Sequence, residues 1–208
     1  MKKIKKIFVV LCLMLMMAMP CYADFVEPQA GDVYLWTSEY LEFCGMNLRV
    51  DFLSIFYGEI PFFTHADLCV DEQGRLRSSI QNKGVSSSSV ENRKRSFVSG
   101  VQLRNTDISK ETIDIVCKTA DTLEGDYDWG GYNGQVMDYL FRMPYFPRGY
   151  FFTSIFQDPE LYYCSEFVVK CFLRGNEMLE VRIHPAPDDI DNIVSITNWK
   201  IVGMWESE

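Results

Sequence analysis

The chain has 208 residues, 48 % of them hydrophobic, with 29 acidic against 20 basic side chains. Four lysines lie within residues 1–23, so the remaining 185 residues carry a net charge of −13. That length suffices for one domain with a full core, and the acidic excess argues against a nucleic-acid partner, which would need basic patches on the protein.

Residues 1–23 have the pattern of a secretory signal peptide. A basic stretch, Lys2–Lys6, precedes the apolar run Ile7–Met19, which is too short to span a bilayer comfortably, and Cys21 and Ala23 are small residues before a cleavage site at Asp24. Lipidation at Cys21 is the weaker alternative, because Pro20 precedes it. We therefore expect a periplasmic or secreted domain, residues 24–208, without a transmembrane helix.

The first predicted strand is Val33–Trp36, which follows the turn at Pro28–Asp32. Residues 38–61 have a mixed pattern, which favours a helix or irregular cover. The next predicted strand, Thr64–Val70, alternates with period two: Ala66, Leu68 and Val70 face the core, and His65, Asp67 and Cys69 face the other way.

A hairpin follows, because Asp71–Gly74 is a strong turn signal and Arg75–Ile80 can return as the partner strand. This hairpin brings Gln81 within reach of His65. By composition Ser86–Ser89 is a loop, and no Gly-x-Ser-x-Gly motif marks a serine nucleophile there.

The second half of the chain is predicted to hold a strand at Ser96–Leu103 and a helix that opens at Ser109 and ends at Gly125. The aromatic-rich segment Asp126–Phe156 is consistent with two alternatives: residues that form and cover the core, or a long loop that lines a cleft. A turn into a short helix is expected at Pro185–Ile190, and a last strand at Trp199–Trp205.

The clearest helix is predicted from Cys164 to Gly175. Apolar or sulfur-bearing side chains recur with helical spacing at positions 164, 167, 168, 171 and 172, Glu166 lies in the first turn, and Gly175 follows the end. A thiol at a helix start feels the positive end of the helix dipole, which favours the thiolate. Cys164 is thus a candidate nucleophile, and a small buried core residue is the alternative.

The remaining residues narrow the chemistry to a thiol and an imidazole. His65 and His184 are the only histidines, and the sequence has no zinc motif and no phosphate-binding glycine loop, so no metal or cofactor is expected. The five cysteines after residue 23 are an odd number, and pairing among Cys44, Cys69, Cys117 and Cys171 cannot be read from the sequence.

A thiol nucleophile needs a base and a polar group that orients the base. Cys164, His65 and Gln81 can supply these roles.

Five features resemble the circularly permuted papain-like hydrolases of the YiiX/YaeF type. These are Gly31-Asp32 before a strand, His65 at a strand start, Ile80-Gln81 followed by Gly84-Val85, Tyr127-Asp128-Trp129, and Tyr162-Tyr163-Cys164-Ser165-Glu166-Phe167. The histidine precedes the cysteine, whereas in ordinary amidases of the NlpC type the cysteine helix comes first. The resemblance covers roughly residues 31–190, and Tyr-Cys-Ser-Glu is its most specific part.

The resemblance implies an α+β fold with a central antiparallel sheet or partial barrel packed against helices, with Cys164 as nucleophile and His65 as base. The family commonly has glutamate at the position of Gln81, whose amide can still orient the imidazole but cannot neutralise its charge. The backbone N–H of Cys164 would be one oxyanion donor, with Tyr127 a candidate for the second and Tyr163 a candidate cleft residue.

The sequence therefore predicts a secreted thiol hydrolase that cleaves an amide or ester through an acyl-enzyme on Cys164. Its substrate would be a cell-wall peptide or an acylated lipid or amino acid. Two alternatives remain: a catalytically weak binding protein on the same fold that recognises cell-wall or lipid fragments, and an enzyme that transfers the acyl group to an acceptor other than water.

Overall fold

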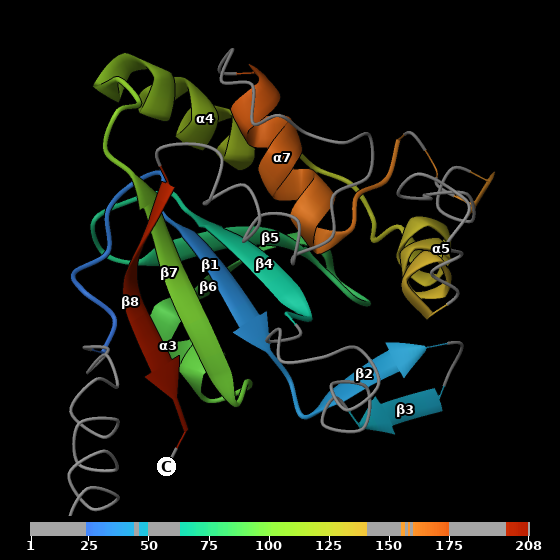
Figure 1. Ribbon diagram of the computed structural model, residues 1–208. Coiled ribbons are helices and arrows are strands. Elements are labelled where there is room, and N and C mark those ends of the chain that lie inside the picture. Colours follow the sequence, from blue (N-terminus) through green and yellow to red (C-terminus); the bar gives the residue numbers. More distant parts are fainter. Residues whose placement is uncertain are drawn as a thin grey trace, which may run out of the picture.

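A six-stranded antiparallel sheet organises the computed structural model, which describes residues 24–43, 46–49, 63–140, 155–156, 158, 160–174 and 199–207 (Figure 1). The strand order is β6-β5-β4-β1-β7-β8. The strands are β1 (Val33–Thr37), β4 (His65–Cys69), β5 (Arg75–Ile80), β6 (Gly84–Ser89), β7 (Ser99–Asn105) and β8 (Trp199–Glu206). With its helices, the sheet makes a mixed α+β fold.

The sequence patterns located five of these six strands. The exception is β6, predicted as a loop from its four serines, which pairs along its whole length with β5. A serine-rich segment is tolerated there because β6 is an edge strand, where one side needs no partner strand and polar side chains can meet water. The β5–β6 connection is tight, and Gly84 adopts φ +62°, which favours glycine.

The segment 38–61 was expected to be helical or irregular, and its described part is a hairpin instead. Strands β2 (Tyr40–Phe43) and β3 (Met46–Arg49) pair with each other in a separate two-stranded sheet. The aromatic spacing was misleading, because a two-stranded ribbon outside the main sheet has no buried face to impose strict alternation. Residues 50–62 lie outside the described residues.

Both faces of the main sheet are covered. One face carries the larger core, which includes Ala66, Leu68 and Val70, and packs against α4 (Lys110–Thr122) and α7 (Cys164–Arg174). The other face packs Tyr34, Trp36 and Cys69 into a smaller cluster, beside α3 (Val90–Lys94) and the ring of Phe25. The predicted alternation in β4 is therefore confirmed, with both sets of side chains buried.

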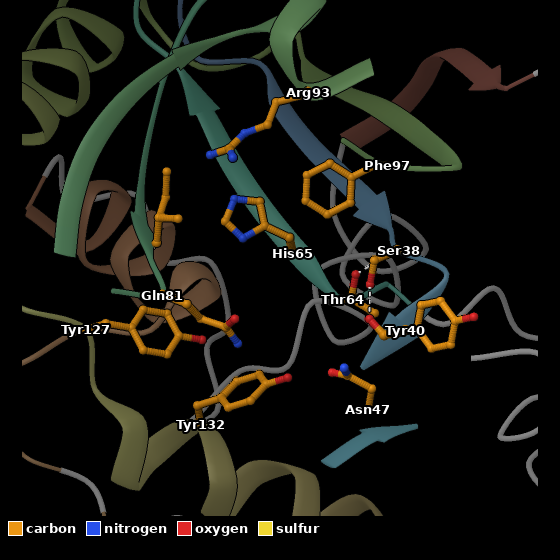
Figure 2. A pocket seen from close by; sticks show the side chains of 11 residues that line it. Ser38, Tyr40, Asn47, Thr64, His65, Gln81, Arg93, Phe97, Tyr127 and Tyr132 are labelled. Carbon is orange, nitrogen blue, oxygen red and sulfur yellow. Dashed lines mark hydrogen bonds between the residues drawn. The ribbon is translucent and has the colours of Figure 1, made fainter. Parts of the chain in front are cut away.

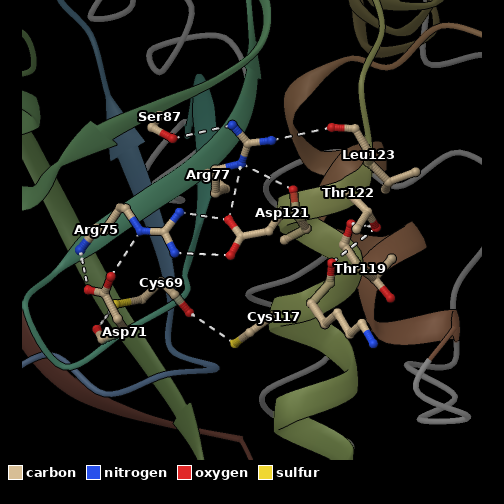
Figure 3. A network of polar contacts seen from close by, with 12 residues as sticks. Cys69, Asp71, Arg75, Arg77, Ser87, Cys117, Thr119, Asp121, Thr122 and Leu123 are labelled. Atoms are coloured by element: carbon tan, nitrogen blue, oxygen red, sulfur yellow. Dashed lines mark hydrogen bonds and ion pairs between the residues drawn. The ribbon is translucent and has the colours of Figure 1, made fainter.

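Helix α4 begins as predicted, because the Ser109 side chain caps it by accepting from the Thr112 N–H at 3.2 Å. Charged side chains join it to the sheet (Figure 3). Arg75 of β5 makes two hydrogen bonds to the Asp121 carboxylate, at 2.7 and 3.0 Å, and Arg77 donates to the carbonyl of Ala120 at 3.1 Å. These contacts fix the C-terminal end of α4 beside β5.

The aromatic-rich segment 126–156 is helical in part, since α5 spans Trp129–Leu140. Residues 141–154 and the predicted turn at Pro185–Ile190 lie outside the described residues. So do residues 1–23, Cys44 and His184.

Cys69, Cys117, Cys164 and Cys171 are free thiols. Across the described ranges, no helix is long and apolar enough to cross a membrane.

Candidate active site

His65 and Asp67 form the first part of the site, on one face at the start of β4. Residues two apart on a strand point the same way, and the His65 Nε2 lies 3.2 Å from the Asp67 Oδ1. The side chain of Asp67 has no exposed surface. The group that orients the imidazole is therefore the Asp67 carboxylate, whereas the sequence had suggested the Gln81 amide.

Arg93 also holds the Asp67 carboxylate. Its Nε donates to Oδ2 at 2.8 Å and its Nη2 to Oδ1 at 2.7 Å, a two-point contact from α3. Burial alone would raise the pKa of Asp67, but the charges and hydrogen bonds of His65 and Arg93 lower it below its usual value. Asp67 thus remains an ionised carboxylate in the interior.

The aromatic ring of Phe97 fixes the plane of the imidazole. It stacks on His65 with ring centres 5.5 Å apart and planes 15° from parallel, and the Arg93 guanidinium lies 5.9 Å from the same ring centre. Burial lowers the pKa of His65, but its interactions with the Asp67 carboxylate and with Cys164 outweigh burial and raise the pKa to about 9. His65 is therefore a strongly basic imidazole held in one orientation.

Cys164 is the first residue of α7, as the sequence predicted. Its side chain hydrogen-bonds to His65. Because the Nε2 of His65 is engaged with Asp67, Nδ1 is the nitrogen left for the sulfur. The structure thus joins the predicted nucleophile and base, 99 residues apart in the chain, and adds the buried carboxylate.

The start of α7 is held against the segment that precedes α5. Tyr127 and Tyr162 form a parallel bridge, in which the Asp128 N–H donates to the Tyr162 carbonyl at 3.1 Å. The Asp128 carboxylate accepts from the Gly131 N–H at 2.8 Å and from the Asp158 N–H at 3.1 Å. This clamp fixes the position of Tyr127 relative to the first turn of α7.

Gln81 lies at the same site but has a different neighbour. Its side chain lies beside the hydroxyl of Tyr127 (Figure 2), whose pKa is well above its usual value, mainly because of burial and also because of the nearby Cys164. Gln81 and Tyr127 both line a pocket of about 280 Å³ that opens beside His65 (Figure 2). The predicted residues are therefore together, with Gln81 on the pocket wall.

Tyr163 and Cys164 do not line this pocket. Tyr163 is completely buried and packs close to Gly131 of α5, so it is part of the interior. The Cys164 side chain is also covered, with 3 % of the residue exposed.

Asp67 and Arg93 are the functional candidates that sequence reasoning missed. The alternation in β4 placed Asp67 beside His65, and this signal was sufficient to find it. Arg93 carried no comparable signal, because its approach depends on the packing of a five-residue helix 26 positions further along the chain.

No protein family, curated protein or solved structure matches the chain. Within the described ranges, no three histidine, cysteine, aspartate or glutamate side chains are grouped so that they could hold a metal ion.

Proposed function

We propose that the protein is a cysteine hydrolase of the permuted papain-like type, which cleaves an amide or ester bond through an acyl-enzyme on Cys164. The observation that carries this proposal is the chain of contacts from the Cys164 thiol through His65 to the buried carboxylate of Asp67. A nucleophile, a base in contact with it and a third group that orients the base are the parts that thiol catalysis requires.

In the proposed reaction, His65 takes the proton of the Cys164 thiol, and the sulfur attacks the carbonyl carbon of the substrate. The carbonyl electron pair moves to oxygen and then returns, breaking the bond to the leaving nitrogen or oxygen, which receives the proton from His65. Water then attacks the thioester while His65 accepts its proton. Release of the carboxylic acid restores the thiol.

Two groups are proposed to stabilise the oxyanion. The backbone N–H of Cys164, in the first turn of α7, is one donor, because helix starts direct N–H groups outward. The Gln81 amide is the second, since it lies on the pocket wall beside the hydroxyl of Tyr127. In this proposal Tyr127 positions the Gln81 amide.

The arrangement of elements supports the permuted fold. His65 opens a strand of an antiparallel sheet, Cys164 opens a helix packed on β4 and β5, and the histidine strand comes first in the chain. The signal-peptide pattern of residues 1–23 supports the further proposal that the enzyme is periplasmic or secreted. Its proposed substrates are cell-wall peptides or acylated lipids or amino acids.

Substitution of the two reacting side chains tests the proposal. Cys164→Ala and His65→Ala are each expected to abolish hydrolysis of activated ester and amide substrates while the circular dichroism spectrum is unchanged. Cys171→Ala is the matched control, because Cys171 lies two turns along the same helix in the core. Hydrolysis retained in both active-site variants contradicts the proposal.

The covered position of Cys164 favours a second candidate, a binding protein on the same fold that recognises cell-wall or lipid fragments. The thiol does not line the pocket that reaches His65. Such a protein would be stabilised thermally by those fragments without forming product. If product forms, chromatography of reactions with added amines or alcohols separates hydrolysis from acyl transfer.

A further inference from the structure

The pocket beside His65 is lined on several sides by aromatic rings. Tyr40, Phe97, Tyr127 and Tyr132 contribute them, from the β2–β3 hairpin, the start of β7 and the region of α5 (Figure 2). Its volume of about 280 Å³ is at the lower end of the roughly 300–1,000 Å³ of small-molecule sites. The pocket thus has room for a ring-sized group and too little for a long lipid chain.

The charged side chains on the pocket wall are already paired. Among the described residues that line it, only His65 and Arg93 are basic and none is acidic. Both direct nitrogen atoms at the Asp67 carboxylate, and His65 also contacts the Cys164 thiol. An anionic ligand would have to compete with Asp67 for these cations, and a cationic ligand would find no carboxylate among the described lining residues.

Most polar groups on the wall are also satisfied within the protein. The Ser38 hydroxyl donates to the Tyr40 carbonyl, and the Thr64 hydroxyl donates to the Trp36 carbonyl at 3.3 Å. Asn47 on β3 is exposed and adds an uncharged amide at the entrance. The wall therefore offers aromatic surface and neutral groups.

We propose that this pocket binds an uncharged, ring-bearing group, and that this group is the acyl side of the substrate. Its placement on the acyl side rests on the proposed thiol chemistry of Cys164, whereas the preference for uncharged ligands does not. Among the proposed substrates, the preference for uncharged ligands favours those with a neutral aromatic acyl group over cell-wall peptides with charged side chains.

Three small molecules of the same shape test the charge preference: 3-phenylpropanol, 3-phenylpropionate and 3-phenylpropylammonium. Binding to the wild-type protein at pH 7 is measured by saturation-transfer NMR titration. The neutral alcohol is expected to bind at least fivefold more tightly than either ion. Equal or tighter binding of an ion, or no binding of the alcohol, overturns the inference.

Variants at the entrance test whether the ligand occupies this pocket. Asn47→Lys is expected to shift the preference toward the carboxylate and Asn47→Asp toward the ammonium, because both place a charge on an exposed residue of the pocket wall. Tyr40→Ala, at a residue 45 % exposed, should weaken binding of the alcohol without unfolding the protein. Unchanged affinities in all three variants overturn the inference.

These probes contain no bond that the enzyme could hydrolyse, so their binding is independent of catalysis. Loss of the hydrolase proposal would appear as activity retained in Cys164→Ala and His65→Ala, with the binding preference intact. Loss of the pocket inference would appear as altered binding preference, with hydrolysis of activated esters still dependent on Cys164.

Discussion

Asp67 keeps its charge without contact with solvent because His65 and Arg93 both contact its carboxylate and lower its pKa. Removing that charge while retaining the shape, as in Asp67→Asn, leaves His65 without the group that stabilises its protonated form. We expect kcat/KM to fall about 100- to 10,000-fold, the range typical of damaged acid–base machinery. The measurement is the rate of activated-ester hydrolysis.

The pH profile of the same variant identifies the cause. Since Asp67 raises the pKa of His65, its neutralisation should move the alkaline limb of the kcat/KM profile from near pH 9 to lower pH. Asp121→Asn is the charge-matched control, because Asp121 pairs with Arg75 and is not among the groups that shift the pKa of His65. An unshifted limb in Asp67→Asn would show that His65 does not depend on this carboxylate.

The same imidazole makes the stability of the fold depend on pH. The pKa of His65 is about 9 in the folded protein, against about 6.5 when unfolded. Its stabilising contribution is therefore complete below pH 6.5 and is lost as the pH rises through 9. We expect the wild type to lose on the order of 2–3 kcal/mol relative to His65→Gln between pH 6 and 10 in urea unfolding. Parallel pH curves would contradict this linkage.

At the scale of elements, the position of the nucleophile depends on how α7 begins. The Glu166 carboxylate accepts from the backbone N–H of Tyr163, the returning half of a capping box, and pairs with Lys170 at 3.0 Å. Burial is nevertheless the largest influence and raises the pKa of Glu166. The acceptor therefore stabilises the helix start, whereas its charge is unfavourable in the interior.

Two substitutions separate these effects. Glu166→Gln keeps an acceptor and removes the charge, so its free energy of unfolding at pH 7 should equal or exceed that of the wild type. Glu166→Ala removes the acceptor and should cost about 1 kcal/mol. Denaturant unfolding measures both, and Lys170→Ala controls for the ion pair. Glutamine as harmful as alanine would show that the charge itself is needed.

The sequence predicted most elements because their patterns reflect burial. Strand β4 alternates because one of its faces packs Ala66 and Leu68 into the larger core, whereas the other carries the polar side chains of His65 and Asp67. Helix α7 shows helical spacing because its apolar stripe packs into the larger core. The β2–β3 hairpin and β6 were missed because neither shows the apolar pattern of a buried strand: β6 is a serine-rich edge strand, and the β2–β3 hairpin lies outside the main sheet. His65 and Cys164 could be paired from the sequence because they are the imidazole and thiol that the chemistry needs. Arg93 could be assigned only from the packed structure.

At the scale of the whole molecule, the sheet has a core on each face, and different elements cover the two cores. Helices α4 and α7 cover the larger core, whereas the smaller one depends partly on the segment that follows the predicted cleavage site. Phe25 packs edge-on against Tyr34 and Trp36, with ring centres 5.2 and 5.4 Å apart, and Lys94 lies 5.1 Å from the centre of its ring.

Truncation of that ring should therefore destabilise the entire sheet. Phe25→Ala is expected to lower the free energy of unfolding by about 2–3 kcal/mol, somewhat less than for a fully buried phenylalanine, because Phe25 is only half-buried. Asp24→Ala, which removes the 3.0 Å contact with Lys94 at an exposed carboxylate, should cost less than about 1 kcal/mol. Because Phe25 packs in the same cluster as the buried free thiol of Cys69, the same unfolding curves followed by Cys69 alkylation should show that thiol becoming accessible in one cooperative step. Alkylation of Cys69 well before global unfolding would instead show that this core opens independently of the rest of the sheet.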